Sequence, residues 1–355
     1  MEYTSIGESC SVVSGGTPSR SKNEYWENGN IPWIKIGNIK SKYVNEYDEL
    51  ITVQGLNNSS AKLLKKGTIL YTIFATLGEV GILDIEACTN QAIAGINITN
   101  PRITTDYLYY YLKSKKDYVN NIGRGVAQNN INLTTLKNFE IPLIDVDKQL
   151  NIVEILEKVE RMICLKEKEI DDLNLLIKAR FIEMFGDPVL NERKFPTLSG
   201  ADFFKLSNGR AVPDEKRIET GIPAYGGNGI SWYTDEFLMA EDTIVVGRVG
   251  FQSGNVHYVI GPLWITDNAM YISQYDKDKF NLRFLCELMQ HVNFSRFQDA
   301  GDLKKITQKP FMTFKYILPS MDLQQKFVNF KIEVDKSRFD IKKSITELER
   351  EVVYD

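Results

Sequence analysis

Loops with basic, amide and glycine residues recur along the chain. In the first half they are TPSRSK at 17–22, WIKIGNIK at 33–40 and GRGVAQNN at 123–130. In the second half, YGGNG at 225–229 and GRVGFQSG at 247–254 stand among further basic residues. Arg and Lys form paired hydrogen bonds with guanine, and Asn and Gln form them with adenine, at the base edges. We therefore interpret these loops, which hold little Asp or Glu, as candidate DNA-reading surfaces.

The candidate contacts divide between the two halves of the chain. In the first half they are Thr17, Ser19, Arg20, Lys22, Trp33, Lys35, Asn38, Lys40, Arg124, Gln128, Asn129 and Asn130. In the second half they are Arg210, Lys216, Arg217, Tyr225, Asn228, Arg248, Lys304, Lys305 and Gln308. Each loop taken alone also fits a simple turn, because Asn and Gly are common turn residues. The glycine-rich stretches are also compatible with phosphate binding.

No catalytic motif accompanies these loops. The sequence has no GxxxxGK[ST] phosphate loop, no GxSxG motif and no Asn-Pro-Pro-Tyr-like loop of an adenine methyltransferase. Only two histidines occur, His257 and His291, and His291 lies in a predicted helix where a structural role is expected. The four cysteines are scattered and form no CxxC pair, which argues against zinc. We expect no catalytic residue and no metal site, although sequence order alone does not exclude a Ser-His-Asp triad.

Composition places the chain among ordinary globular proteins. It has 355 residues, of which 43% are hydrophobic and 25% charged, a length that suggests two domains or slightly more. No apolar run is long enough for a membrane helix, and the N-terminus MEYTSIGESC lacks the features of a secretory signal. We expect a cytoplasmic protein with reduced thiols and no membrane partner. The net charge of −4 argues weakly against nucleic-acid binding.

The sequence repeats itself at an offset of about 177 residues. TNQAI at 89–93 matches TDNAM at 266–270, and EIPLIDVDKQ at 140–149 parallels YILPSMDLQQ at 316–325. Several matches in the same order indicate a duplication rather than chance. The chain is therefore predicted to consist of two tandem copies.

Each copy ends in a predicted heptad helix. Apolar residues step by four and three from Ile152 to Ile177, interrupted at Lys166, and again from Val334 to Val352, interrupted at Arg338. Such periodicity favours two helices that pair with each other, although each could instead pack on its own domain. An antiparallel pair is the natural arrangement, because a globular domain intervenes. The predicted pairing seam comprises Ile163, Ile170, Leu173, Ile177, Val334, Ile341, Ile345 and Leu348.

The segments before these helices show short β-type runs. IPWIKI, TILYTIF, DTIVVG and LWITDNAMYI alternate with turn signals such as ENGN and GGNG. Helices are predicted at 104–121 and 278–298. The fold class is therefore α+β, with a twisted, irregular β-sheet in each copy.

Several of these segments, taken together, resemble the specificity subunit of type I restriction-modification systems, the HsdS family. The similarity lies in SGGTPSRSKNEYWENGNIPWIKIGNI at 14–39, TNQAI, GVAQNNINL at 125–133, EIPLIDVDKQLNIVEIL and FIEMFGDPVLNERKFP at 181–196. It covers essentially the whole chain. The second copy departs from the first, because DAGDLKKITQKPF stands at 299–311 where the first has GRGVAQNNINLTT.

The resemblance implies two target-recognition domains separated by two long antiparallel coiled-coil helices. Its expected boundaries are 1–140 for the first recognition domain, 141–186 for the central spacer helix, 187–317 for the second recognition domain and 318–355 for the C-terminal spacer helix. Each domain would read one half of a bipartite site on double-stranded DNA. The helices would set the gap and dock two methyltransferase subunits, and restriction subunits can join such a complex.

The resemblance also implies that the reaction belongs to the partners. The methyltransferase subunits would bind S-adenosylmethionine and methylate adenine at N6, while this chain would hold no cofactor and catalyse nothing. Partner docking is expected on the outer helix faces and near Phe181–Phe185. Two other hypotheses remain: a DNA-acting enzyme with unrecognised motifs, and a stand-alone DNA-binding or scaffold protein.

Overall fold

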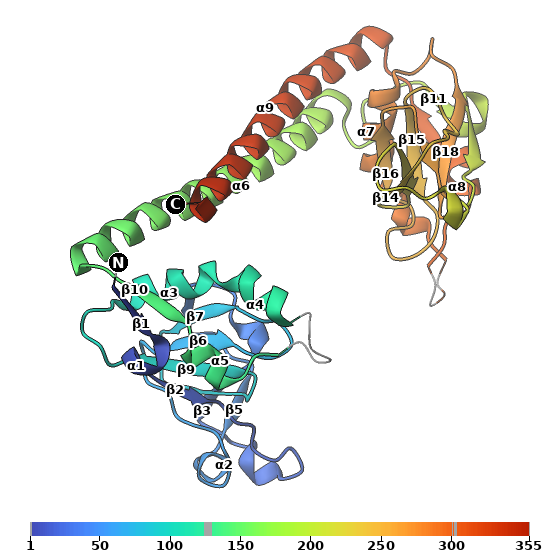
Figure 1. Ribbon diagram of the computed structural model, residues 1–355. Helices are drawn as coiled ribbons and strands as arrows, with labels where there is room; N and C mark the ends of the chain where they lie inside the picture. Colours follow the sequence, from blue (N-terminus) through green and yellow to red (C-terminus); the bar gives the residue numbers. More distant parts are fainter. Residues whose placement is uncertain (1, 124–129, 300, 302–303, 355) are drawn as a thin grey trace. The chain divides into compact units, whose positions relative to one another are not determined.

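The computed structural model describes residues 2–123, 130–299, 301 and 304–354. The chain forms two compact units, Met1–Cys164 together with Thr346–Asp355, and Leu165–Ile345. Each unit holds a layered β-rich body, and two long helices, α6 (Val146–Phe185) and α9 (Met321–Tyr354), complete the fold (Figure 1). The units are described one at a time.

The described residues of the first unit form three sheets. Its strands are β1 (Glu2–Ser5), β2 (Cys10–Ser14), β3 (Ile31–Ile34), β4 (Tyr43–Val44), β5 (Glu49–Ile51), β6 (Ile69–Thr72), β7 (Val80–Leu83), β8 (Cys88–Thr89), β9 (Ile93–Ile98) and β10 (Glu140–Leu143). They form a five-stranded sheet β2-β9-β6-β7-β4, a three-stranded sheet β5-β3-β8 and the pair β1-β10. Its short helices are α1 (Ile6–Ser9), α2 (Val53–Asn57), α3 (Thr105–Ser114), α4 (Lys116–Gly123), α5 (Leu133–Lys137) and the 3-10 turns Asn23–Tyr25 and Ile36–Asn38.

The core of this unit lies between the five-stranded sheet and α3. All residues of β6 and β7 are buried, as expected for strands that read as continuous apolar runs. Leu108 and Leu112 of α3 are fully buried in the same cluster as Ile69 and Tyr71 of β6. The helix predicted at 104–121 is present as α3 and α4, which Lys115 separates.

The second unit repeats this plan. Its strands are β11 (Thr197–Ser199), β12 (Phe204–Asn208), β13 (Ile222–Gly226), β14 (Gly229–Thr234), β15 (Thr243–Gly247), β16 (Val256–Val259), β17 (Trp264–Ile265), β18 (Ala269–Tyr275) and β19 (Lys315–Ile317). They form a four-stranded sheet β12-β18-β15-β16, a three-stranded sheet β14-β13-β17 and the pair β11-β19. Its short helices are α7 (Leu282–Val292), α8 (Lys309–Thr313) and the 3-10 turns Gly200–Asp202, Asp214–Lys216 and Phe294–Phe297.

The duplication is visible strand by strand. The pairings β2-β9-β6-β7 and β5-β3-β8 correspond to β12-β18-β15-β16 and β14-β13-β17, with the same parallel and antiparallel neighbours. Gly15 and Gly209 occupy equivalent tight positions, where an added Cβ would lie 2.2 Å from Asn90 O and 2.1 Å from Thr266 O. The repeated TNQAI and TDNAM segments therefore each pass directly against a glycine that a larger residue cannot replace.

A buried glutamine joins each long helix to its own domain. Gln149 of α6 donates to the Arg102 and Ile144 carbonyls, and its Oε1 accepts from the backbone nitrogen of Thr104, the residue before α3. Gln324 of α9 makes the same contacts with Lys279, Pro319 and Asn281, the residue before α7. Both glutamines are fully buried. Their matched hydrogen bonds fix the direction in which each helix leaves its domain.

The two long helices pair in antiparallel fashion within the second unit. Phe181 and Phe185, near the end of α6, pack on Phe327 near the start of α9 at ring distances of 5.4 and 5.7 Å. Ile177 and Val334 are buried in the same apolar cluster. Figure 1 shows α6 and α9 side by side over this stretch. The predicted mutual pairing is therefore present in this unit.

The heptad seam also accounts for the exposure pattern along both helices. Ile177 and Val334 are buried, and the other six predicted seam residues (Ile163, Ile170, Leu173, Ile341, Ile345 and Leu348) are half-buried. Leu175 and Phe339 lie off the seam and are 61% and 67% exposed. The helices have 40 and 34 residues, which is about 60 and 50 Å at 1.5 Å per residue.

The helix ends refine two expectations. Residues 141–143, placed with the spacer helix from sequence, belong to β10, which pairs with β1. At the Phe181–Phe185 end, where partner docking is expected, both phenylalanine rings are fully buried in the core of the second unit, so the rings themselves are not available to a partner. The two rings attach α6 to the second domain.

Candidate nucleic-acid interface

In the first unit, one ion-pair cluster gathers several predicted contacts on the three-stranded sheet. Arg20 Nη1 lies 2.5 Å from Glu49 Oε2, and Lys35 Nζ lies 2.8 Å from Glu49 Oε1. Asn38 donates to Asp48, which is 3.6 Å from the Lys35 amine. The Arg20 guanidinium beside Glu49 holds the pKa of that carboxyl below its ordinary value.

Two of the predicted contacts in this unit lie beneath the surface. Trp33 is 3% exposed and its Nε1 donates to the Gly16 carbonyl. Asn38 is 5% exposed, and its Oδ1 accepts from the Lys35 backbone nitrogen. Their burial suits them to support Arg20 and Lys35 from below. Thr17 bonds to Gln91 of the TNQAI segment, which joins that segment to the same surface.

The remaining predicted contacts of the first unit lie apart from the cluster. Lys22 donates to the Tyr25 hydroxyl at 2.9 Å, and exposed Lys40 lies 3.4 Å from Glu46. The Ser19 hydroxyl pairs with that of Ser21. Asn130 forms an isolated β-bridge with Phe74. Arg124, Gln128 and Asn129 lie outside the described residues.

The second unit carries its own basic surface around β13, β14 and β17. Arg217 stacks over Trp232 at 4.1 Å and pairs with Asp214 at 2.6 Å. Lys216 pairs with Glu236 at 2.6 Å. Arg210 is exposed, and its backbone contacts the three-stranded sheet: the Arg210 carbonyl accepts a hydrogen bond from Nε1 of Trp264 in β17.

A second group of predicted contacts gathers at the end of β15. The backbone of Arg248 accepts from Ile306, and the Lys304 carbonyl accepts from Gly250, so the 248–250 and 304–306 segments run together. Lys304 lies over the ring of Phe251, which is 82% exposed. Lys305 bridges to Val249 in the same strip. These side chains form a basic and aromatic edge open to solvent.

The last three predicted contacts of this unit have separate surroundings. Exposed Asn228 lies in the turn between β13 and β14. Tyr225 is half-buried against the core of this sheet. Gln308 donates weakly to Asn208 at 3.4 Å. Among the described residues, the side chains of Asn228, Tyr225 and Gln308 form no hydrogen bond with the Arg217 cluster or with the Arg248 edge.

The acidic partners are what the sequence interpretation missed. Acidic residues that lie outside most of these loops in the sequence pair with five of the predicted cations, Arg20, Lys35, Lys40, Lys216 and Arg217; these acids are Glu49, Asp48, Glu46, Asp214 and Glu236. Glu49 is directly opposite Trp33 in the β3-β5 register. That register depends on long-range pairing, so spacing along the chain gave no signal for it.

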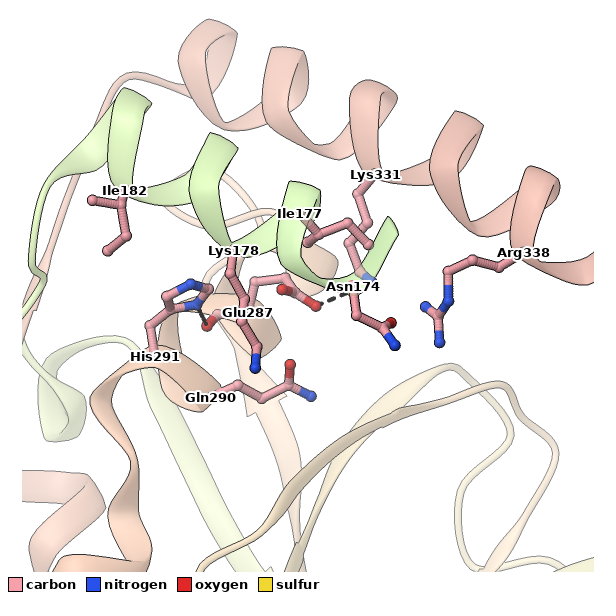
Figure 2. Close-up of a pocket in the computed structure, with 9 residues that line it drawn as sticks. All are labelled: Asn174, Ile177, Lys178, Ile182, Glu287, Gln290, His291, Lys331 and Arg338. Carbon is pink, nitrogen blue, oxygen red and sulfur yellow. Dashed lines mark hydrogen bonds and ion pairs between the residues drawn. The ribbon is translucent and has the colours of Figure 1, made fainter. Parts of the chain in front are cut away.

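A cleft of about 630 Å³ lies in the second unit between α7, the end of α6 and the start of α9 (Figure 2). Buried Glu287 pairs with Lys331 at 3.1 Å, and Lys331 pairs with Asp335 at 3.0 Å. Arg338, the interruption in the second heptad seam, pairs with Asp335 at 2.8 Å. Because these charges largely satisfy one another, the cleft is a structural junction that ties α9 to α7.

Both histidines of the chain belong to the second unit. His291 donates through Nδ1 to the Glu287 carbonyl at 2.9 Å and stacks on Phe181 at 3.9 Å, in keeping with its expected structural role. Burial lowers the pKa of His291 and of His257 below the ordinary value of 6.5. A histidine whose pKa is lowered in the folded state has no effect on stability while it is neutral in both the folded and the unfolded chain, and it destabilises the folded state once the unfolded chain becomes protonated.

We expect the second unit to lose stability as pH falls from 7 to 5, while the first, which has no histidine, changes little. Below about pH 6.5 the histidines of the unfolded chain bind protons, while those of the folded unit stay neutral. The free energy of unfolding therefore falls by at most about 1.4 kcal/mol per pH unit for each histidine. Native-state hydrogen exchange at several pH values measures each unit separately. In a His257→Gln/His291→Gln variant the difference should vanish; persistence of the same slope would show that other groups cause it.

The described residues show neither a metal cluster nor a membrane span. No group of three or more His, Cys, Asp or Glu side chains among them could hold a metal ion. No helix in the described part of the chain is long and apolar enough to cross a bilayer.

Comparison with known proteins identifies the family. The model of the type I restriction modification DNA specificity domain matches residues 1–175 and, a second time, residues 195–350. The chain belongs to this family. Its role is DNA sequence specificity within a type I restriction-modification complex, and the specificity subunit is not the catalytic one. The two matches agree with the duplication seen in the sequence and in the strand order.

Individual relatives extend the likeness over the whole chain. The EcoprrI type I restriction enzyme specificity subunit of Escherichia coli is 23% identical, over 99% of this chain and 90% of its own length. The fold resembles the solved S subunit of the type I restriction-modification system from M. genitalium, with a TM-score of 0.58 at 18% identity, covering 99% of this chain and 93% of that one. A solved structure from work on complex assembly and conformational transition of the type I R-M system gives 0.64 at 14% identity, covering 99% and 94%.

Proposed function

We propose that this specificity subunit selects a bipartite, asymmetric site on double-stranded DNA, with one recognition domain reading each half. The observation that carries the proposal is the duplication. Each unit has its own three-stranded sheet with a tryptophan-supported arginine on it, yet the side chains around that arginine differ. Two copies of one scaffold with different surface residues suit two different half-sites.

The long helices set the gap between the half-sites in this proposal. Gln149 fixes the start of α6 to the first domain. Phe181 and Phe185 fix its end to the second. The pairing of α6 with α9 in the second unit stiffens the connection. A helix held firmly at both ends transmits its length to the domains that it joins, whereas a flexible linker would not.

The outer helix faces provide the docking surface for partners. On the second unit, Leu165, Leu175, Leu176 and Phe339 are 61%, 61%, 46% and 67% exposed, away from the pairing seam. Apolar side chains left exposed along a helix suit burial against another helix. We assign them to two methyltransferase subunits, which bind S-adenosylmethionine and methylate adenine at N6. Restriction subunits then join that complex, and the assembly acts in the cytoplasm.

The low charge of the chain predicts that it binds DNA poorly by itself. Non-specific attraction grows with the number of phosphates that a protein neutralises. Here the net charge is −4, and Arg20, Lys35, Lys216 and Arg217 are already paired with carboxylates. We expect the complex with its methyltransferase subunit to bind a cognate site on the order of 100-fold more tightly at equal salt.

Gel-shift titration of a DNA fragment carrying the site, with the chain alone and with the reconstituted complex, measures the difference. The methyltransferase subunit alone is the control. Equally tight, sequence-specific binding by the isolated chain would favour a stand-alone DNA-binding protein. Methylation or cleavage by the isolated chain would favour a DNA-acting enzyme.

A further inference from the structure

An arginine lies over the same position of the three-stranded sheet in both units. In the first, Trp33 of β3 is opposite Glu49 of β5. In the second, Ala224 of β13 is opposite Trp232 of β14, which is the equivalent pair. Arg20 comes from the loop before β3 and Arg217 from the loop before β13. An arginine therefore lies over this pair in both units, although the two arginines come from different points of the loop and the residues of the pair differ.

In each arginine, a tryptophan ring covers one face of the guanidinium and a carboxylate binds one of its edges. The Arg20 guanidinium lies 3.6 Å from the centre of the Trp26 ring and 5.0 Å from that of Trp33, and Glu49 holds one nitrogen. The Trp26 indole is itself fixed, because its Nε1 donates to the Ser19 carbonyl at 3.1 Å. Stacking and a carboxylate together orient the planar guanidinium without using all five of its donors.

Arg217 is held in the same way. Its guanidinium lies 4.1 Å from the Trp232 ring centre, Asp214 holds Nη1 at 2.6 Å, and Nη2 donates one hydrogen to the Val212 carbonyl at 3.3 Å. The Arg20 and Arg217 side chains remain 53% and 40% exposed. Their free donors therefore remain accessible to a ligand.

The charges around Arg20 argue against a site that binds only a DNA phosphate. Around Arg20, the charges of Arg20 and Lys35 are offset by those of Asp48 and Glu49. A carboxylate 2.5 Å from the guanidinium would repel an approaching phosphate. A base edge carries no net charge, and guanine presents two acceptors, O6 and N7, with the spacing of a guanidinium. The arrangement suits base recognition.

We propose that Arg20 and Arg217 each read a guanine in the major groove of their own half-site. The proposal rests on the proposed function, since it requires that each unit reads one half-site. Glu49 and Asp214 act in it as the groups that orient the arginines. Trp26 and Trp232 are the surfaces on which the arginines lie.

The test uses the complex reconstituted with its methyltransferase subunit and a set of duplexes, each with one base pair of the site replaced. Arg20→Lys keeps the charge and loses the paired donors. We expect discrimination at one G·C pair of the first half-site to fall roughly 10- to 100-fold, with the second half-site unchanged. Arg217→Lys should produce the converse. Because charge is kept, the salt dependence of binding should stay the same.

Two further variants complete the design. Glu49→Gln, which removes the carboxylate that orients Arg20, should weaken the guanine preference within the first half-site only. Lys66→Ala, which removes a surface lysine paired with Asp84 outside the predicted interface, should alter no base preference. Thermal melting of every variant confirms that the domain is folded.

Two outcomes would overturn the proposal: unchanged base preferences in both arginine variants, or a loss spread evenly over all positions. If the wild-type complex methylates a defined site while Arg20→Lys reads it identically, only the arginine assignment fails. If the wild-type complex selects no bipartite site, the proposed function fails as well.

Discussion

Replacing Phe181 by alanine is expected to destabilise the second unit by about 3–5 kcal/mol, the range for deletion of a fully buried phenylalanine. The ring is fully buried and packs on Phe185, Phe284, Phe327 and His291 at 3.9 to 6.0 Å. It joins α6 both to α9 and to the body of the second domain. For a unit of this size the melting temperature should fall by on the order of 10 °C.

Phe339→Ala is the matched control for this variant. It removes the same side chain from α9, where the ring is 67% exposed, so stability should change by less than about 0.5 kcal/mol. Differential scanning calorimetry of both variants measures the contrast. Equal shifts would mean that the aromatic cluster at the end of α6 does not hold the second unit together. The same Phe339 variant should weaken assembly with a methyltransferase subunit while leaving the fold intact.

The elements that sequence reasoning found are those with a local signal. Heptad spacing is read from neighbouring residues, so the two long helices and their seam could be predicted. The interruption at Arg338 is explained only by the fold, because its partner Asp335 belongs to an ion-pair chain that reaches Glu287 on α7. The matched EIPLIDVDKQ and YILPSMDLQQ segments were recognised as a repeat.

The buried polar contacts behind that repeat could not be predicted. Gln149 finds its partners at Arg102 and Thr104, more than 40 positions away along the chain. The same limit applies to the interface. Arg20 and Lys35 were recognised as candidates from their residue types, but Glu49, which brings them together, was not. Its place opposite Trp33 follows from strand register, which no spacing rule supplies.

Lengthening the connection between the two domains should shift the recognised gap. Four extra helical residues after Asp172 add about 6 Å and rotate the following chain by about 40°. One base-pair step is about 3.4 Å and about 35° of twist. The added length therefore corresponds to slightly fewer than two base-pair steps, and the added rotation corresponds to about one base-pair step. The same variant carries a second insertion of four residues after Phe339 of α9, so that the lengthened α6 still pairs with α9 along its added turn.

The control uses the connectivity of the chain. Only α6 runs from the first domain to the second, whereas α9 follows the second domain. Insertion after Phe339 alone should therefore leave the gap as it is, although it disturbs the register of the pairing seam. The double insertion should abolish methylation at the original spacing, because both domains can no longer contact their half-sites at once.

Single-molecule sequencing of modified adenines, in cells that express the methyltransferase subunit with the wild-type or lengthened chain, measures this most directly. We expect the wild-type chain to give one bipartite motif with a fixed gap. The lengthened chain should give the same two half-sites, separated by one or two additional base pairs. An unchanged gap in the lengthened variant would contradict the role of α6 as the element that sets the spacing.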